Sequence, residues 1–139
     1  MDNGQKHTVG QHITYFEEPD IIYMKLSGAV VEAHGGELNR LHREFGRGRS
    51  HVFLLFDLSD LEKIDPGVRK EAGATLKMIP MRGAAIFGAP MKARVVAKLI
   101  LTAMNLFKSE AEKAPVQFFD NEAEARDFIA KKRREIGAS

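Results

Sequence analysis

The sequence predicts one α/β domain with a single mixed, largely parallel five-stranded sheet. A length of 139 residues suits one domain with a sizeable core, and 44% hydrophobic with 29% charged residues is an ordinary globular composition. The continuous apolar run from Val52 to Phe56 is typical of a strand that is buried on both faces. Elsewhere, short β-prone runs alternate with helical patterns, which favours right-handed crossovers and parallel strands.

The first part of the chain predicts an antiparallel hairpin followed by a helix. Ile13 to Phe16 and Ile21 to Leu26 are β-prone, and Glu17 to Asp20 between them has the composition of a turn. From Val31 to Gly46, apolar residues recur near helical spacing. The polar Met1 to Gly10 is expected to be a flexible segment ahead of a domain that spans 11–136.

The remaining elements alternate between strand and helix, so that the predicted order is β-β-α-β-α-β-α-β-α. They are a central strand around Phe53, a helix from Pro66 to Ile79 with Asp65 as N-cap, a strand at Ala84 to Phe87, a helix from Pro90 to about Lys108, a strand at Val116 to Phe119, and a last helix capped by Asp120 or Asn121 with Phe128 and Ile129 on its inner face. Proline suits a helix start because the first helical N–H has no partner within the helix.

Composition and charge exclude several classes of protein. With 21 Lys and Arg against 19 Asp and Glu, the formal charge is only +2, so we expect no nucleic-acid partner. The chain contains no cysteine, which excludes disulfides and thiolate metal sites and fits a cytoplasmic protein. The most apolar run, Val95 to Met104, is shorter than the roughly 20 residues of a spanning helix. We therefore expect no transmembrane segment, and the N-terminus has no signal-peptide pattern.

Three carboxylates and a hydroxyl follow the central strand, between Asp57 and Gly67. Crevices at the carboxyl ends of strands are common ligand sites in α/β sheets. A simpler interpretation is that Asp65 only caps the next helix and that Asp60 and Glu62 are solvated.

At these residues the sequence resembles the STAS domains, the anti-sigma-factor-antagonist family that is also called SpoIIAA-like. The family pattern is an apolar strand, Asp-Leu-Ser, a spacer with an apolar residue, and an apolar residue before Asp-Ser-Ser-Gly. Phe53 to Ser59, Leu61, Ile64 and Asp65 follow this pattern. The order of the elements agrees over nearly the whole chain, so the resemblance implies a SpoIIAA-like fold.

The chain departs from that pattern at the residue that carries the family's switch. Antagonists of the family are phosphorylated on the second serine of Asp-Ser-Ser-Gly, and the corresponding residue here is Gly67, which has no hydroxyl. Ser59 remains as a weaker acceptor. The chain is more similar to a divergent branch that shares its topology with the lipid-carrying Sec14-type domains, which implies a binding or scaffold role.

Other motifs give little support to catalysis or metal binding. Arg82 and Arg94 can flank the start of the third helix, whose N–H groups favour an anion, but no phosphate-loop signature is present. His34 and His42 lie eight residues apart on one helix, about 12 Å, which is too far for two ligands of one metal ion. We expect no enzyme, no metal site and no cofactor.

The third helix has a wider apolar arc than one sheet face requires. Its polar residues Arg94, Lys98, Asn105 and Lys108 form a narrow stripe. Leu101 lies within that stripe and is the residue most expected to be exposed. The arc is either roofed by neighbours such as Phe128 and Ile129, or it contacts a dimer partner, a target protein, a lipid chain or a membrane surface.

Three functions remain as hypotheses, and the weakest is a phospho-switched antagonist that acts through Ser59. The first is a non-enzymatic STAS-like interaction or regulatory module with a protein partner, with homodimers and peripheral membrane contact left open. The second is a carrier or sensor of a small apolar or lipid-like ligand, whose acidic head group would meet Arg82 or Arg94. The candidate contact surface is Asp57, Ser59, Asp65, Gly67, Arg82, Arg94, Leu101 and Met104.

Overall fold

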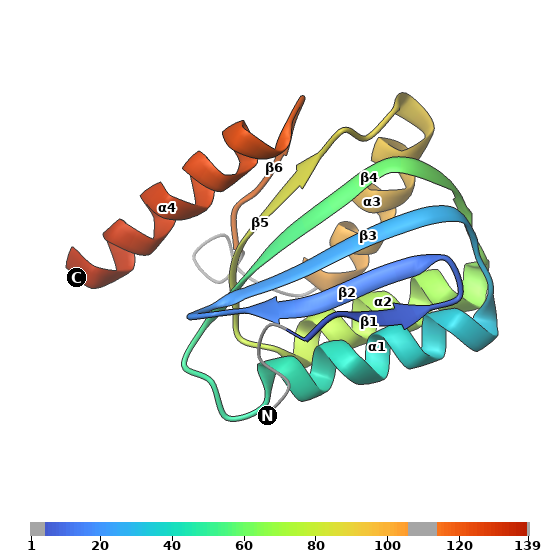
Figure 1. The fold of residues 1–139 in the computed structure, drawn as a ribbon, viewed down its shortest axis with the longest axis horizontal. Coiled ribbons are helices and arrows are strands. Elements are labelled where there is room, and N and C mark those ends of the chain that lie inside the picture. The colour runs from blue at the N-terminus through green and yellow to red at the C-terminus, as the bar shows by residue number, and fades with distance from the viewer. Residues whose placement is uncertain (1–4, 106–113, 139) are drawn as a thin grey trace.

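A six-stranded sheet forms the centre of the computed structural model, which describes residues 5–105 and 114–138 (Figure 1). Its strands lie side by side in chain order and are β1 (His7–Val9), β2 (His12–Glu17), β3 (Ile21–Val30), β4 (Val52–Ile64), β5 (Met81–Phe87) and β6 (Val116–Phe119). The helices are α1 (Glu32–Gly46), α2 (Pro66–Met78), α3 (Met91–Asn105) and α4 (Glu122–Ala138). β1 to β3 pair antiparallel, and β3 to β6 pair parallel, which confirms the predicted mixed sheet.

The sheet has one strand more than the five that were predicted. His7–Val9 lies in the segment that was expected to be flexible, but it pairs with β2 in register His7 to Thr14. Gly10 at φ 60° provides the tight turn between the two strands. The short run was missed because its three residues have no apolar alternation.

β4 is much longer than predicted. The segment from Asp57 to Ile64 was expected to be a turn, and this was wrong, because it continues the strand beside the second half of β3. Leu58 and Leu61 are buried on the helical side, whereas Ser59 and Asp60 are exposed. A strand with one solvated face accepts charged residues at its outward positions, so the polar composition did not require a turn.

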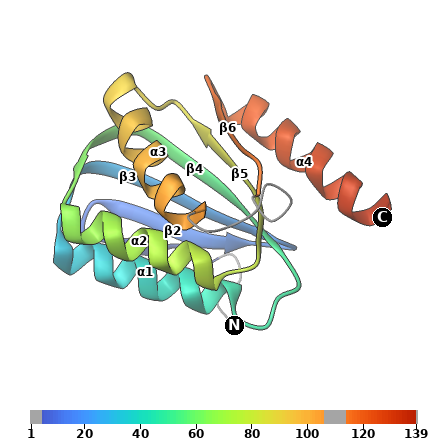
Figure 2. The ribbon, with the colours of Figure 1, turned by 180° about the vertical axis from the view of Figure 1, so that it is seen from behind.

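Two layers of helices close the sheet. Figures 1 and 2 show α1, α2 and α3 on one face and α4 on the other. The inner side of α4 contributes Ala125 and Ile129 to a cluster with Phe53 and Leu55 of β4. The expectation that Phe128 and Ile129 roof the third helix was therefore wrong, since the two helices lie on opposite faces.

Local signals in the sequence set the ends of several helices as expected. Pro66 is the first residue of α2, and the side-chain oxygen of Asn121 accepts the Glu124 backbone N–H at 2.9 Å before α4. Asp65 occupies the N-cap position of α2, but its side chain makes no capping hydrogen bond. α1 and α2 approach closely at Gly35, where an added Cβ would lie 2.5 Å from Val68.

Candidate functional site: an apolar cavity under three helices

A cavity of about 90 Å³ lies between the sheet and the helices α1, α2 and α3. Its walls are almost wholly apolar and come from both core clusters on this face of the sheet. The lining residues are Met24, Leu26, Val30, Gly35, Leu38, Asn39, His42, Leu54, Phe56, Leu58, Leu61, Ile64, Val68, Ala72, Leu76, Ala84, Ile86, Ala97, Ile100 and Leu101. Most natural cores fill such space, because protein interiors pack like organic crystals.

Small residues at facing positions explain why the core is hollow here. Gly35, Ala72, Ala84 and Ala97 come from α1, α2, β5 and α3 in turn, and all four line the cavity. A larger side chain at Ala72, Ala84 or Ala97 would extend into the space, whereas an added Cβ at Gly35 would collide with Val68. The cavity is thus encoded by small residues on four elements that are far apart in the sequence.

Asn39 and His42 supply the polar groups of the cavity wall. They lie three residues apart on α1, so both face the sheet from one side of the helix. His42 Nε2 lies 3.1 Å from the Thr14 hydroxyl, and burial lowers the pKa of His42 to about 4. The imidazole is therefore neutral at pH 7.

The orientation of α3 places its small residues inside and several large ones outside. Ala93 and Ala97 are buried against the sheet, whereas Met91, Val95 and Leu99 are 76%, 52% and 54% exposed. We call these last three residues the α3 stripe. They are spaced by four and therefore lie along one side of the helix.

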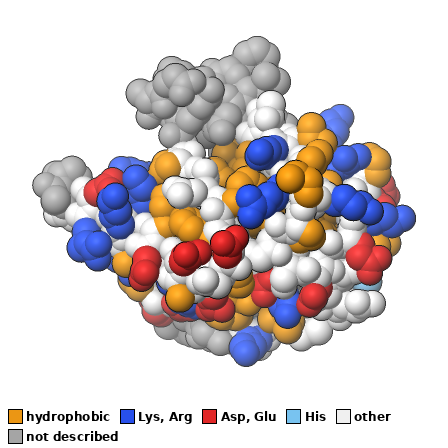
Figure 3. Space-filling model, turned by 90° about the horizontal axis from the view of Figure 1, so that it is seen from above, with side chains coloured by type: hydrophobic (Ala, Val, Ile, Leu, Met, Phe, Trp, Pro, Cys, Tyr) orange, Lys and Arg blue, Asp and Glu red, His pale blue; other side chains and the backbone are white. Residues whose placement is uncertain are grey.

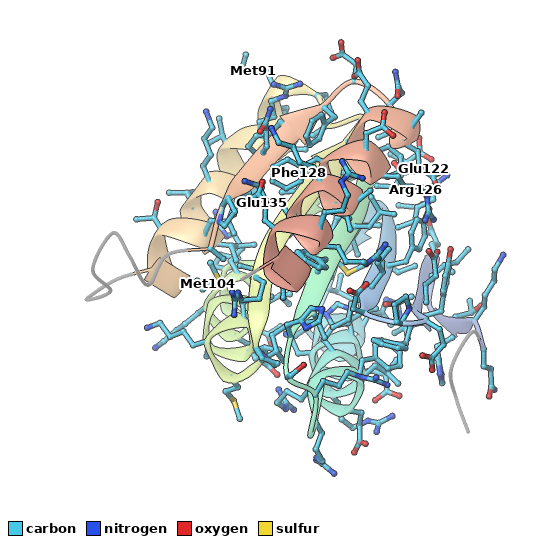
Figure 4. All side chains as sticks on the ribbon, turned by 90° about the vertical axis from the view of Figure 1, so that its left-hand side faces the viewer. Met91, Met104, Glu122, Arg126, Phe128 and Glu135 are labelled. Atoms are coloured by element: carbon cyan, nitrogen blue, oxygen red, sulfur yellow. The ribbon has the colours of Figure 1, made fainter. Side chains whose placement is uncertain are left out.

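Leu101 and Met104 do not belong to a surface. Leu101 was expected to be exposed, and this was wrong, because it packs against both core clusters and lines the cavity. Met104 is fully buried at the opposite end of α3 from Met91 (Figure 4). The orientation of the helix was misjudged because the polar stripe was taken as its outward side, whereas α3 turns Met91, Val95 and Leu99 outward. Phe107 and Lys108 of the predicted helix lie outside the described residues.

Asp57 and Ser59 form a local cluster at the carboxyl end of β5. Asp57 Oδ1 accepts hydrogen bonds from the Ser59 hydroxyl at 2.6 Å and from the Ser59 backbone N–H at 3.0 Å. Lys25 Nζ lies 3.9 Å from Asp57 and 3.4 Å from Asp60. Gly88 approaches so closely that an added Cβ would be 3.0 Å from the Ser59 Cβ. The Ser59 hydroxyl is therefore held by one carboxylate and lies in an acidic surrounding.

Asp65 and Gly67 lie well away from that cluster. The eight residues from Asp57 to Asp65 are mostly extended, which corresponds to about 25 Å at a strand's rise. An added Cβ at Gly67 would lie 2.7 Å from Glu32 Oε1, so a phosphate at this position would meet a carboxylate. The structure thus separates the two parts of the predicted surface.

Arg82 and Arg94 are also apart. Arg82 is exposed near the start of β5, whereas α3 begins after the end of that strand. Arg94 Nε donates to the Ala89 carbonyl at 3.1 Å, and its guanidinium lies 5.2 Å from the centroid of the Phe118 ring. The expectation that both arginines flank the third helix was wrong for Arg82, and neither residue lines the cavity.

A chain of Ser50, His51 and Asp20 is a feature that sequence reasoning missed. The Ser50 hydroxyl lies 3.2 Å from His51 Nδ1, and His51 Nε2 lies 2.9 Å from Asp20 Oδ2. Asp20 is also held by Arg133, whose Nη2 donates to Oδ1 at 2.6 Å. That pairing removes the free carboxylate which would support an imidazolium in a hydrolase, and none of the three residues lines the cavity.

Comparison with known proteins gives a match at the level of structure. An uncharacterized protein of the DUF3478 family with a SpoIIAA-like fold, from Shewanella loihica PV-4, superposes with a TM-score of 0.60 and 16% sequence identity. The match covers 83% of this chain and 89% of that one. The domain has the SpoIIAA-like fold. No protein-family model and no curated protein matches the sequence.

The described helices and the acidic and histidine side chains bear on membrane and metal binding. Within residues 5–105 and 114–138, no helix of this SpoIIAA-like domain has the length and apolarity to cross a membrane. In the same part of the chain, no three His, Asp or Glu side chains are grouped so that they can hold a metal ion.

Proposed function

We propose that this SpoIIAA-like domain is a non-enzymatic module that binds a small, largely apolar ligand in the cavity under α1, α2 and α3. The observation that carries the proposal is an apolar cavity of about 90 Å³ in the core. Side chains that border this space lack packing contacts on that side. A ligand that fills it regains contacts with the walls, and this favours binding.

The position of the cavity agrees with a carrier or sensor. One wall is α3, whose outer side is the exposed α3 stripe, and whose inner side contributes Ala97, Ile100 and Leu101. A ligand that pushes on α3 from inside would change a surface that other molecules can contact. Binding and signalling are then coupled through one helix.

A pair of matched alanine variants tests this proposal. Ala72 lines the cavity from α2, whereas Ala74 is exposed on the same helix. We expect the full chain, purified gently and measured by native mass spectrometry, to carry a bound small molecule. Ala72→Leu should abolish that added mass and Ala74→Leu should retain it. If wild-type protein shows only the apo mass, and toluene gives no thermal shift, the proposal is wrong.

The non-enzymatic part of the proposal has its own test. We expect hydrolysis of p-nitrophenyl acetate at the rate of free imidazole, with no change in Ser50→Ala. A wild-type rate well above that background, lost in Ser50→Ala and in His51→Gln, would show instead that Ser50, His51 and Asp20 act as a hydrolase.

A second candidate function, contact with a protein partner, is favoured by the α3 stripe. Lys92, Arg94 and Lys98 flank the stripe, and α3 contains no acidic residue from Met91 to Asn105. Figure 3 shows hydrophobic side chains among Lys and Arg on one face of the domain. Two copies of α3 would repel each other, so we infer a partner with apolar groups surrounded by acidic side chains.

A substitution at Leu99 distinguishes this contact from non-specific binding. Leu99→Glu should abolish capture of one specific acidic protein at low ionic strength. Met78→Glu should retain it, because Met78 is 70% exposed on α2 and not on α3. Equal loss in both variants, or capture only by anionic vesicles, would exclude a protein partner at the stripe.

A further inference from the structure

Asn39 is a buried residue whose side-chain amide has no hydrogen-bond partner among the described residues. Its polar atoms keep some accessible surface, since the wholly buried, unpaired side-chain atom in that part of the chain is His7 Nε2. The Asn39 side chain lines the cavity, and the residue is only 5% exposed. A carboxamide has two N–H donors and one carbonyl acceptor, and leaving such a group unpaired in an apolar interior costs about 1 to 3 kcal/mol. An apolar leucine would fit an apolar cavity better. The amide therefore points to a polar group in whatever occupies the space.

The hydrogen bonds around His42 define which of its nitrogens is free. The Thr14 hydroxyl has one proton, and it donates this proton to the Tyr23 carbonyl at 2.6 Å. The 3.1 Å contact between Thr14 Oγ1 and His42 Nε2 is then a bond in which Nε2–H donates. His42 Nδ1 is left as an acceptor. Since burial lowers the pKa of His42 to about 4, Nδ1 carries no proton at neutral pH.

The charge of the cavity wall restricts the ligand further. The lining residues include no Lys, Arg, Asp or Glu. A carboxylate or an ammonium group placed here would lose its hydration without gaining a counter-ion, which is strongly unfavourable. Arg94 supplies no counter-ion either, because its guanidinium faces the Ala89 carbonyl and the Phe118 ring and the residue does not line the cavity.

We propose that the cavity selects a compact, uncharged molecule with an apolar body and one hydroxyl group, held between Asn39 and His42. The hydroxyl proton is donated to His42 Nδ1, and the hydroxyl oxygen accepts an N–H from the Asn39 amide. Side chains three residues apart on a helix are neighbours at about 5 to 6 Å between Cβ atoms, so one oxygen can lie between them. This inference rests on the proposed ligand-binding function and names the class of ligand.

The size of the cavity suggests suitable probes. A designed cavity of about 150 Å³ binds benzene in another protein, so about 90 Å³ suits a ligand of a single small ring or less. Phenol and toluene have nearly the same shape and differ in one hydroxyl against one methyl. Benzoate has a similar ring and carries a charge. The three probes therefore separate shape, hydrogen bonding and charge.

The experiment is a titration of the full chain with phenol, toluene and benzoate at pH 7, measured by calorimetry. We expect phenol to bind at least tenfold more tightly than toluene and benzoate not to bind. If toluene binds as tightly as phenol, or benzoate binds better, the inference about the hydroxyl is wrong while the proposed apolar site stands. If none of the three binds, the proposed function and the inference both fail.

A second readout locates the hydroxyl. In wild-type protein, the side-chain amide signals of Asn39 should shift on addition of phenol but much less on addition of toluene, whereas those of Asn121, which caps α4, should not move. In Asn39→Leu, which removes the amide at nearly constant volume, the preference for phenol should be lost and toluene binding retained. An unchanged preference in this variant, or unmoved Asn39 signals in the wild type, would overturn the assignment.

Discussion

On the α4 face of the sheet, Ala125 and Ile129 pack against Phe53 and Leu55, and two arginines hydrogen-bond the helix to the hairpin. On the other face, three helices enclose about 90 Å³ that the side chains do not fill. The hydrogen bonds that hold α4 to the hairpin run from Arg126 to Glu17 at 2.8 and 2.9 Å and from Arg133 to Asp20 at 2.6 and 3.0 Å.

The two faces of the sheet therefore have different roles. The α4 face closes the sheet through apolar contacts between α4 and β4 and through the arginine pairs to Glu17 and Asp20, and α4 lies along the sheet in Figure 4. On the face with the cavity, small residues such as Ala84 and Ala97 leave space unfilled, so fewer packing contacts form there. A cavity on one face and a helix held by ion pairs on the other are consistent with a binding site on a stable support.

The largest difference between the faces is expected from truncation of buried aliphatic residues. Ile129→Ala should lower the free energy of unfolding by about 4 kcal/mol, because Ile129 is 1% exposed in a filled cluster. Leu101→Ala should lower it by only about 1 to 2 kcal/mol, because Leu101 is half-buried and already borders a cavity. Urea denaturation of both variants measures the difference. Equal losses would show that the two faces are packed alike.

Acid should affect the two faces in different pH ranges. Burial lowers the pKa of His42 from 6.5 to about 4. As the pH falls, this imidazole is therefore protonated in the unfolded chain before it is protonated in the folded one. This contribution to stability is present above pH 6.5 and is lost as the pH falls toward 4, about 3 kcal/mol in all.

On the α4 face, burial alone would raise the pKa of Asp20, but hydrogen bonds from Arg133 and His51 outweigh it and hold the pKa below 3.8. Its contribution is present above pH 3.8 and is lost only below that value. The free energy of unfolding, measured from pH 7 to 3, should therefore fall in two separate pH ranges. His42→Gln should remove the fall between pH 6.5 and 4, and Asp20→Asn should remove the fall below pH 3.8. A single fall that neither variant changes would contradict this.

The ion pairs of Arg133 and Arg126 should contribute differently to the free energy of unfolding. Arg133→Met leaves the carboxylate of Asp20, whose side chain is 4% exposed, with only His51 as a partner, and should cost about 2 kcal/mol of stability. Arg126→Met removes contacts to the half-exposed Glu17 and Glu122 and should cost about 0.5 kcal/mol. Thermal unfolding in low and high salt tests this, and only the Arg126 contribution should weaken clearly in high salt.

The smallest effect, and the most direct comparison, is expected at neighbouring alanines of β5. Ala85 belongs to the filled cluster under α4, and Ala84 lines the cavity on the opposite face. Ala85→Val should cost about 1 to 2 kcal/mol by overpacking, whereas Ala84→Val should change stability by less than about 0.5 kcal/mol because its methyl groups enter free space. A larger loss for Ala84→Val than for Ala85→Val would mean that the cavity is not available to side chains.

Several elements were predictable because their signals are local. The hairpin, the start of α2 at Pro66, the strand Val116–Phe119 and the cap at Asn121 all follow from residues within a few positions of one another. The element order was confirmed, with one short strand added. The cavity was not predicted, although Asn39 and His42 next to the apolar Leu38 and Leu41 in α1 are a readable sign of a polar group in a core.

By itself, the sequence determined the class of fold, the order of its elements after the first short strand, and the lack of a hydroxyl at Gly67. These depend on residue types and on short-range spacing. The tertiary structure alone decided that Asp57 to Ile64 extends β4, that α3 turns Ala97 inward and Leu99 outward, and that a cavity remains between three strands and three helices. Each of these results from pairing and packing between distant segments, where the space left by one residue depends on the size of residues elsewhere in the chain.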